Sequence, residues 1–195
     1  MIEFITAHWI ELLAAFINFI WVYLEFKAST WLWPVGIILP MLYIVVSLNA
    51  HFYGNVIINV YYLVTSIIGW IMWLRKGNSQ EAAPITDISR RAVFISLGLG
   101  IVGYISAYIL LKSYTDSLVP WADALATIIS FIGMIWLANK WQQHWFCWMI
   151  ANFISIFIFY ASRDYISTFV FFVNTIVSVL GFFNWRKMKM QQNIK

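Results

Sequence analysis

The sequence predicts an all-α integral membrane protein with seven transmembrane helices. Of its 195 residues, 63% are hydrophobic and only 10% are charged, whereas soluble domains carry about 25% charged residues. Four long stretches contain no Lys, Arg, Asp or Glu: 28–74, 92–111, 141–162 and 165–185. An uncharged stretch of about 20 residues can cross a bilayer as one helix. This composition excludes a soluble enzyme, a nucleic-acid-binding domain and a secreted disulfide scaffold.

Charged positions and turn formers set the limits of each predicted helix. The stretch 28–74 is long enough for two crossings, and turn formers divide it between Asn49 and Asn55. Two further spans tolerate one acidic residue near their start, Glu11 and Asp123. The predicted spans are 9–26, 31–49, 55–74, 92–111, 119–139, 143–161 and 165–185. Since 75–91 is the only polar loop of any length, residues 1–195 are predicted to form a single transmembrane domain.

The distribution of basic residues predicts the orientation in the membrane. The side that holds the N-terminus carries only Lys112 and Arg163, and the other side carries the remaining ten of the 12 Lys and Arg residues. Cytoplasmic loops are enriched in Lys and Arg. We therefore expect a multi-pass protein of the cell (inner) membrane with its N-terminus outside and its C-terminus in the cytoplasm.

An offset of 112 residues aligns the chain with itself, and Trp33, Gly69 and Trp73 then match Trp145, Gly181 and Trp185. Residues 9–74 form the first three-helix repeat, 92–111 a linker helix and 119–185 the second repeat. After three crossings, a second repeat that followed directly would have the opposite orientation in the membrane. The linker helix adds one crossing and restores the orientation, so the repeats are predicted to be parallel in a 3+1+3 arrangement. Transporters with such repeats bind substrate near the midplane between the halves.

The sixth predicted span carries Trp145, Trp148 and Asn152 on one helical face. A carboxamide facing lipid would be unsatisfied, so Asn152 is expected to face protein or a cavity. The two indoles could hold a flat ring, and a cationic ring would add cation–π attraction. The alternative is that Trp145 belongs to the interfacial aromatic belt and Asn152 only joins helices.

Polar residues on two other spans extend this candidate substrate site. Asn59 and Tyr62 lie one turn apart on the third span, and the repeat matches Tyr62 with Asn174 on the seventh. Ser and Gly on the same faces are also typical of close helix packing. Pro40 in the second span is either a hinge or a static kink.

Several expected absences narrow the function. No Asp or Glu lies near the centre of a predicted span, and proton relays usually use such carboxylates, so facilitated diffusion is favoured. His8, His51 and His144 form no ligand cluster, which predicts no metal site. We expect no catalytic residues, no cofactor and no nucleic-acid partner, and therefore no enzyme activity.

Five segments together resemble the PnuC-type vitamin transporters. They are Trp31–Gly36, Leu42–Tyr43, Tyr62–Ser66, Gly69–Trp73 and the W-x-x-W-x-x-x-N motif of Trp145, Trp148 and Asn152. The resemblance extends over about residues 9–187. It implies a SWEET-like 3+1+3 fold and facilitated uptake of nicotinamide riboside, which is then trapped by cytoplasmic phosphorylation.

The resemblance also implies roles for these residues. Trp145 and Trp148 would frame the aromatic ring of the substrate, and Asn152 would hydrogen-bond it. Asn59 stands where many members have Gln. Similar proteins carry thiamine or riboflavin, so thiamine is the alternative substrate. A non-transporting membrane scaffold or sensor is the alternative of a different class. The expected partners are a small vitamin and the lipid bilayer, with a homo-oligomer left open.

Overall fold

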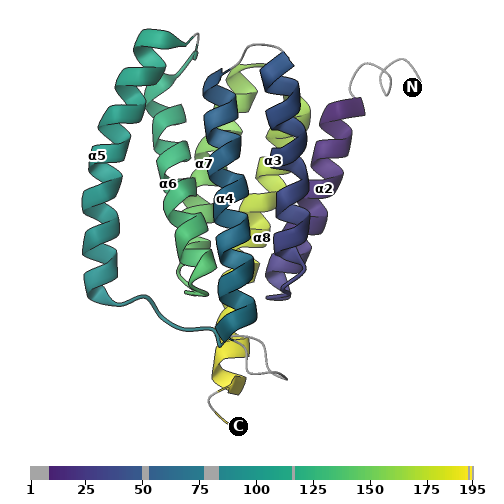
Figure 1. Cartoon of the computed structure of the whole chain (residues 1–195), viewed down its shortest axis with the longest axis vertical. Coiled ribbons are helices and arrows are strands. Elements are labelled where there is room, and N and C mark those ends of the chain that lie inside the picture. Colours follow the sequence, from purple (N-terminus) through teal and green to yellow (C-terminus); the bar gives the residue numbers. More distant parts are fainter. Residues whose placement is uncertain (1–8, 50–52, 77–83, 116, 193, 195) are drawn as a thin grey trace. The chain divides into compact units, whose positions relative to one another are not determined.

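The structure, a computed structural model, describes residues 9–49, 53–76, 84–115, 117–192 and 194. Seven helices lie within these residues, which confirms the all-helical prediction (Figure 1). They are α2 (Trp9–Phe26), α3 (Leu32–Asn49), α4 (Tyr53–Lys76), α5 (Arg90–Tyr114), α6 (Pro120–Ala138), α7 (His144–Ala161) and α8 (Tyr165–Gln192). Residues 50–52 of the turn expected between Asn49 and Asn55, and residues 77–83 of the polar loop, lie outside the described part of the chain.

The observed helix limits agree with the predicted spans to within a few residues except at the end of α8. This helix was expected to end at 185 but continues to Gln192. The segment 186–192 contains neither Gly nor Pro, and its Arg, Lys, Met and Gln residues are good helix formers. Lys189 in the last turn also stabilises the helix, because its positive charge lies near the negative end of the helix dipole.

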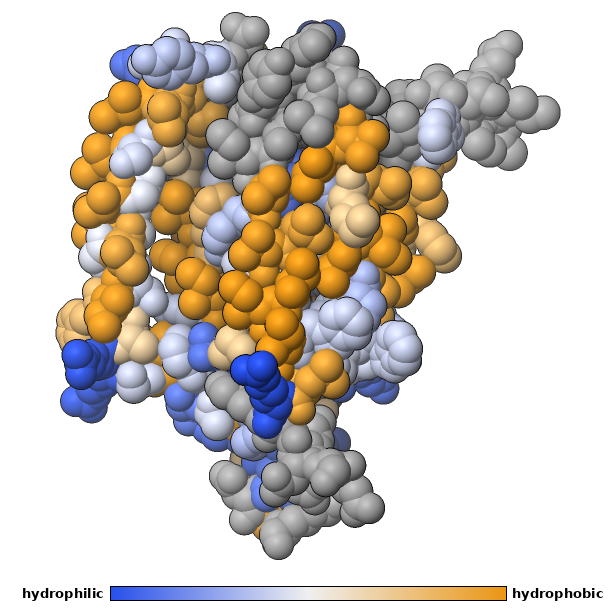
Figure 2. Space-filling model, viewed as in Figure 1, coloured by the Kyte–Doolittle hydropathy of each residue, from blue (hydrophilic) through white to orange (hydrophobic). Residues whose placement is uncertain are grey.

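Five of the described helices contain a segment long and apolar enough to cross a membrane. These segments are Ile58–Arg75, Arg90–Tyr114, Pro120–Ala138, His144–Ala161 and Tyr165–Gln192. In α2 and α3, the described apolar stretches are shorter, Leu12–Phe26 and Leu32–Leu42. No described residue of α5 is buried, and its visible face is a hydrophobic band with hydrophilic residues at its start (Figure 2). Such a surface suits lipid rather than water.

The chain divides into two compact units, residues 1–84 and 85–195. In the first unit, α3 packs against both α2 and α4. In the second unit, α7 packs in the same way against α6 and α8, and α5 packs against α6. Within each unit the middle helix of the three therefore contacts both of its neighbours.

In each unit a tryptophan ring packs directly on a glycine of the following helix. A Cβ atom added at Gly69 would lie 2.3 Å from the ring of Trp33, and one added at Gly181 would lie 2.5 Å from the ring of Trp145. A second tryptophan meets each ring edge-on, with Trp73 centred 5.4 Å from Trp33 and Trp185 centred 6.0 Å from Trp145. These Trp–Gly–Trp contacts, 112 residues apart, thus have a similar geometry in the two units.

Helix α3 continues through Pro40 without a break. Proline has no N–H, so the carbonyl of Gly36, four residues earlier, loses its usual helical donor. The hydroxyl of Ser66 on α4 donates to that carbonyl at 3.3 Å. A side chain of the neighbouring helix thereby satisfies a backbone group that lipid could not satisfy.

Helices α2 and α6 end in the same turn. Ala28 and Lys140 both have left-handed backbone, with φ of 50° and 60°. The N–H group of Ser29 donates to the carbonyl five residues earlier at 2.9 Å, and the N–H group of Trp141 does the same at 3.0 Å. This is the Schellman motif, which usually uses glycine. Burial lowers the pKa of the Lys140 side chain to about 8.

The tryptophan–glycine packing predicts that Gly181→Ala and Gly69→Ala destabilise the protein. The new Cβ would overlap a buried indole, and overpacking typically costs about 1–3 kcal/mol. We expect both variants to have a lower melting temperature in detergent. Gly98→Ala is the matched control, because an added Cβ there meets no described atom within 4 Å. Equal melting temperatures for all three variants would contradict this account of the packing.

Candidate functional site

The face of α7 predicted to bind substrate spans two turns of the second unit. Trp145 is only 1% exposed, whereas Trp148 and Asn152 are half-buried. The ring of Trp148 lies on the α6 side, 3.4 Å from the position of a Cβ at Gly133. The ring of Trp145 lies against α8 at Gly181.

A hydrogen-bond chain fixes the orientation of the Asn152 carboxamide. The hydroxyl of Ser178 donates its single hydrogen to the backbone carbonyl of Asn174 at 2.7 Å. The oxygen of Ser178 can therefore only accept from Asn152, whose Nδ2 lies 3.3 Å away. This leaves Oδ1 of Asn152 at the other end of the amide, where it accepts no hydrogen bond from any described residue. The site thus presents an oriented acceptor near the middle of α7.

The other predicted site residues are divided between the two units. Asn174 is 5% exposed on α8 of the second unit, and Asn59 is 8% exposed on α4 of the first. Tyr62, one turn after Asn59, is half-buried and meets the ring of Tyr61 edge-on with centroids 5.6 Å apart. Each unit therefore buries an asparagine inside an apolar helix, where a polar group needs a partner.

The immediate surroundings of Trp145 were not predicted from the sequence. His144 is fully buried, and its ring lies 4.8 Å from Trp145 and 4.6 Å from Trp185. Its Nδ1 lies 2.8 Å from the carbonyl of Trp141, which can only accept, so Nδ1 carries the proton. Among the described residues, neither the indole N–H of Trp145 nor that of Trp33 has a hydrogen-bond partner. The shared Trp–Gly–Trp spacing in the two halves was the available signal for this packing.

The segment 85–88, which we name the strap, crosses the end of the second unit before α5 begins. The N–H group of Thr86 donates to the carbonyl of Lys140 at 3.1 Å, and the backbone N–H group of Gln142 donates to the carbonyl of Thr86 at 3.0 Å. This pairing forms a parallel bridge between Thr86 and Trp141. The strap is thereby joined to the loop between α6 and α7.

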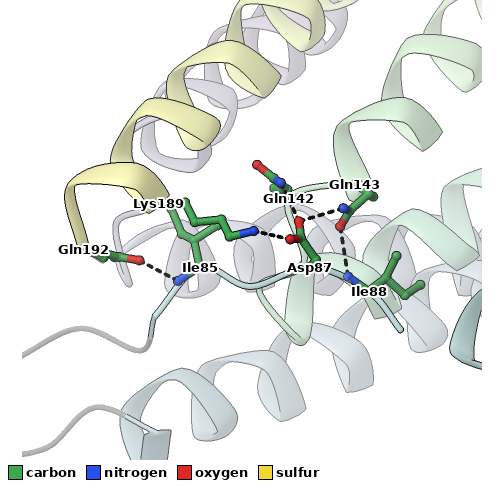
Figure 3. Close-up of polar contacts among 7 residues, drawn as sticks. All are labelled: Ile85, Asp87, Ile88, Gln142, Gln143, Lys189 and Gln192. Atoms are coloured by element: carbon green, nitrogen blue, oxygen red, sulfur yellow. Dashed lines mark hydrogen bonds and ion pairs between the residues drawn. The ribbon is translucent and has the colours of Figure 1, made fainter. Parts of the chain in front are cut away.

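Side chains fasten the strap at three more points (Figure 3). Asp87 forms an ion pair with Lys189 of α8 and accepts hydrogen bonds from the amides of Gln142 and Gln143. The N–H groups of the strap are bound as well, that of Ile88 by Gln143 and that of Ile85 by Gln192, both at 3.0 Å. The hydrogen bond from Lys189 lowers the pKa of Asp87, so the carboxylate stays ionised at neutral pH.

Within the described residues, no group of three or more His, Cys, Asp or Glu side chains could hold a metal ion. His8 and His51 lie outside these residues. Cys147 is a buried free thiol on α7. The polar groups of the predicted site residues are carboxamides, a phenol hydroxyl and indoles, which can form hydrogen bonds and stack on rings.

Comparisons with known proteins agree on one family. Residues 8–187 match the family described as nicotinamide mononucleotide transporter. The chain is 24% identical to the riboflavin/roseoflavin transporter RibM of Streptomyces davaonensis, covering 91% of this chain and 84% of that protein. It is 23% identical to the nicotinamide riboside transporter PnuC of Haemophilus influenzae, covering 95% and 82%. A crystal structure of the vitamin B3 transporter PnuC matches 97% of this chain and 85% of its own, with a TM-score of 0.76 and 19% identity.

The contacts of the strap predict that Asp87→Asn loosens it. The variant loses the charge attraction to Lys189, and we expect faster amide hydrogen exchange at 85–88. Acid should have the same effect on the unchanged protein. Because the folded-state pKa of Asp87 is lowered, its contribution is present above the ordinary aspartate value of about 4 and is lost at lower pH. Lys187→Gln, which removes a neighbouring charge outside these contacts, should leave the exchange unchanged.

Proposed function

Because the chain belongs to the nicotinamide mononucleotide transporter family, we propose that it carries nicotinamide riboside across the cell (inner) membrane by facilitated diffusion. Relatives named for this substrate match most of the chain. Phosphorylation of the substrate in the cytoplasm would trap it there. The charge asymmetry of the loops supports an N-terminus outside and a C-terminus in the cytoplasm.

The proposed architecture is the 3+1+3 arrangement with seven crossings. Helices α2–α4 form one half, α6–α8 form the other, and α5 is the linker. Two observations support it. The same tryptophan–glycine packing occurs 112 residues apart, and the helix ends at Ala28 and Lys140 have the same backbone geometry. In this arrangement the substrate would bind near the bilayer midplane, between the halves.

The observation that carries the assignment is the oriented acceptor on Asn152. Its Nδ2 is committed to Ser178, so its Oδ1 can accept a hydrogen bond from the carboxamide N–H of nicotinamide. Trp148 lies one turn away on the same face of α7, and its half-buried indole can stack on the pyridinium ring. The positive charge of that ring would strengthen the contact through cation–π attraction.

The remaining predicted residues complete the proposed site. As the resemblance implies, Trp145 would frame the ring together with Trp148. Asn59, Tyr62 and Asn174 would contact the polar parts of the substrate, since they carry hydrogen-bonding groups within apolar helices. Buried polar groups at such depth mark substrate paths in membrane proteins. They favour a transporter over a scaffold or sensor.

Riboflavin is the second candidate substrate, because the Streptomyces davaonensis relative is named for riboflavin and roseoflavin. Thiamine is a third, since it combines a cationic ring with an amino donor. All three molecules offer an N–H group to Asn152 and a flat ring to Trp148. Only a direct comparison of uptake separates them.

We expect Asn152→Leu to abolish uptake of the substrate while leaving expression intact. Leucine has a similar size but cannot accept a hydrogen bond. Uptake of labelled nicotinamide riboside, thiamine and riboflavin into cells lacking their own transporters would measure the effect. Phe153→Leu is the matched control, because Phe153 is the next residue of α7 and is 55% exposed.

Nicotinamide riboside should give the highest specific uptake of the three vitamins. Normal uptake by Asn152→Leu would refute the site, and preferred uptake of riboflavin or thiamine would reassign the substrate.

Passive transport predicts that purified protein in liposomes equilibrates its substrate without a proton gradient. The most buried carboxylate among the described residues is Glu25, 1% exposed near the end of α2. We expect Glu25→Gln to equilibrate substrate as the unchanged protein does, with or without a protonophore. A protonophore that prevents equilibration in the unchanged protein would disprove facilitated diffusion, most clearly if Glu25→Gln removed that sensitivity.

A further inference from the structure

Ser178 joins α8 to α7 through two hydrogen bonds of opposite direction. It is 2% exposed, and Asn174, one turn earlier on α8, is 5% exposed. The Ser178 hydroxyl lies 2.7 Å from the carbonyl of Asn174 and 3.3 Å from Nδ2 of Asn152 on α7. Its single hydrogen goes to the carbonyl, because Nδ2 is only a donor. Since burial keeps water from replacing either contact, the hydroxyl donates to α8 and accepts from α7.

This arrangement leaves the other end of the Asn152 carboxamide open to a ligand. Oδ1 of Asn152 accepts no hydrogen bond from any described residue. Unlike the indole nitrogen of Trp145, which is fully buried, this oxygen keeps accessible surface. A carboxamide oxygen can only accept a hydrogen bond. A ligand group that reaches Oδ1 must therefore bring the hydrogen.

We infer that Ser178 is a positioning residue that makes the site selective for a ring substituent carrying an N–H group. This inference rests on the proposed function and specifies the substrate class of the same site. Asn152 follows Trp148 by four residues on α7, or about 6 Å along the helix axis, so its amide would lie at the edge of a ring stacked on Trp148. There Oδ1 accepts from a carboxamide, whereas a ketone, ester or carboxylate of similar shape offers it no hydrogen.

The orientation of the Asn152 amide depends on Ser178. Their contact is the only hydrogen bond that the Asn152 side chain forms with the described residues. With alanine at 178 the amide loses this bond and can turn end for end about its last side-chain bond. It then presents Nδ2, a donor, where Oδ1 stood. Selectivity for an N–H group is lost, while stacking of the ring on Trp148 remains.

The test compares two cationic ligands of the same shape. In 3-acetylpyridine riboside a methyl group replaces the amino group of nicotinamide riboside. A site built to bond an N–H group rejects an analogue without it, so we expect the full chain in phosphatidylcholine nanodiscs to bind nicotinamide riboside at least about tenfold more tightly. Isothermal titration calorimetry measures both affinities. Ser178→Ala should reduce their ratio to below about threefold. Ser178→Cys, which fills the same space with a weakly accepting sulfur, should lower the ratio in the same direction.

Ser155→Ala is the matched control on α7. Ser155 is 9% exposed, and its hydroxyl donates to the carbonyl of Ala151 at 2.9 Å. The substitution therefore also removes a buried hydroxyl that bonds the carbonyl four residues earlier, but it leaves the Asn152 amide held. The affinity ratio should stay that of the unchanged protein. Equal falls in Ser155→Ala and Ser178→Ala would show general loosening of the helices and overturn the inference.

A second substitution in the Ser178→Ala background tests the orientation itself. Both oxygens of a carboxylate accept hydrogen bonds, so Asn152→Asp presents an acceptor whichever way the group is turned. The two ligands carry the same charge, so the added negative charge does not favour one of them. The double variant should recover the preference for nicotinamide riboside. A double variant as unselective as Ser178→Ala would overturn the inference.

Failure of the inference and failure of the transport proposal give different results. If the unchanged protein does not bind nicotinamide riboside, both are overturned. Equal binding of the two ribosides by the unchanged protein, or an unaltered ratio in Ser178→Ala, would overturn only the role of Ser178. Uptake of nicotinamide riboside by the unchanged protein would then still stand.

Discussion

The packing of a tryptophan ring on a glycine holds the middle helix of each unit to the helix that follows it. Lipid tails are as apolar as leucine, so helices in a membrane associate through close packing rather than through exclusion of water. Trp33 and Trp145 achieve this because Gly69 and Gly181 leave room for the indole directly on the backbone. The position of Trp145 in turn sets the rotation of α7, and with it the direction in which Asn152 points.

The hydrogen bonds of the buried polar groups differ between the two units. In the first, Ser66 donates to a backbone carbonyl that Pro40 leaves without a donor, so the serine restores a broken helical bond. In the second, the matching Ser178 accepts from Asn152, which stands where the repeat has Pro40. The matching serine therefore satisfies a backbone carbonyl in the first unit and orients the Asn152 amide in the second. The second unit thus has an oriented hydrogen-bond acceptor at the position that Pro40 occupies in the first.

The strap is joined to the rest of the second unit through backbone and side-chain bonds. Asp87 gathers contacts from the α6–α7 loop and from α8, outside the apolar part of the helices where water would otherwise compete. Its ion pair alone would contribute little at an exposed position. Several bonds to one carboxylate and to the strap amides make the attachment specific.

The sequence by itself determined the all-helical membrane class, most helix limits and the family, because charge exclusion from lipid and the length of a crossing leave few alternatives. The W-x-x-W-x-x-x-N spacing also placed Trp148 and Asn152 on one face of α7. Only the tertiary structure decided that Trp145 packs on Gly181 and which end of the Asn152 amide is left to accept. It also decided that α8 continues to meet the strap. These features depend on contacts between residues far apart in the chain, and helical periodicity does not predict such contacts.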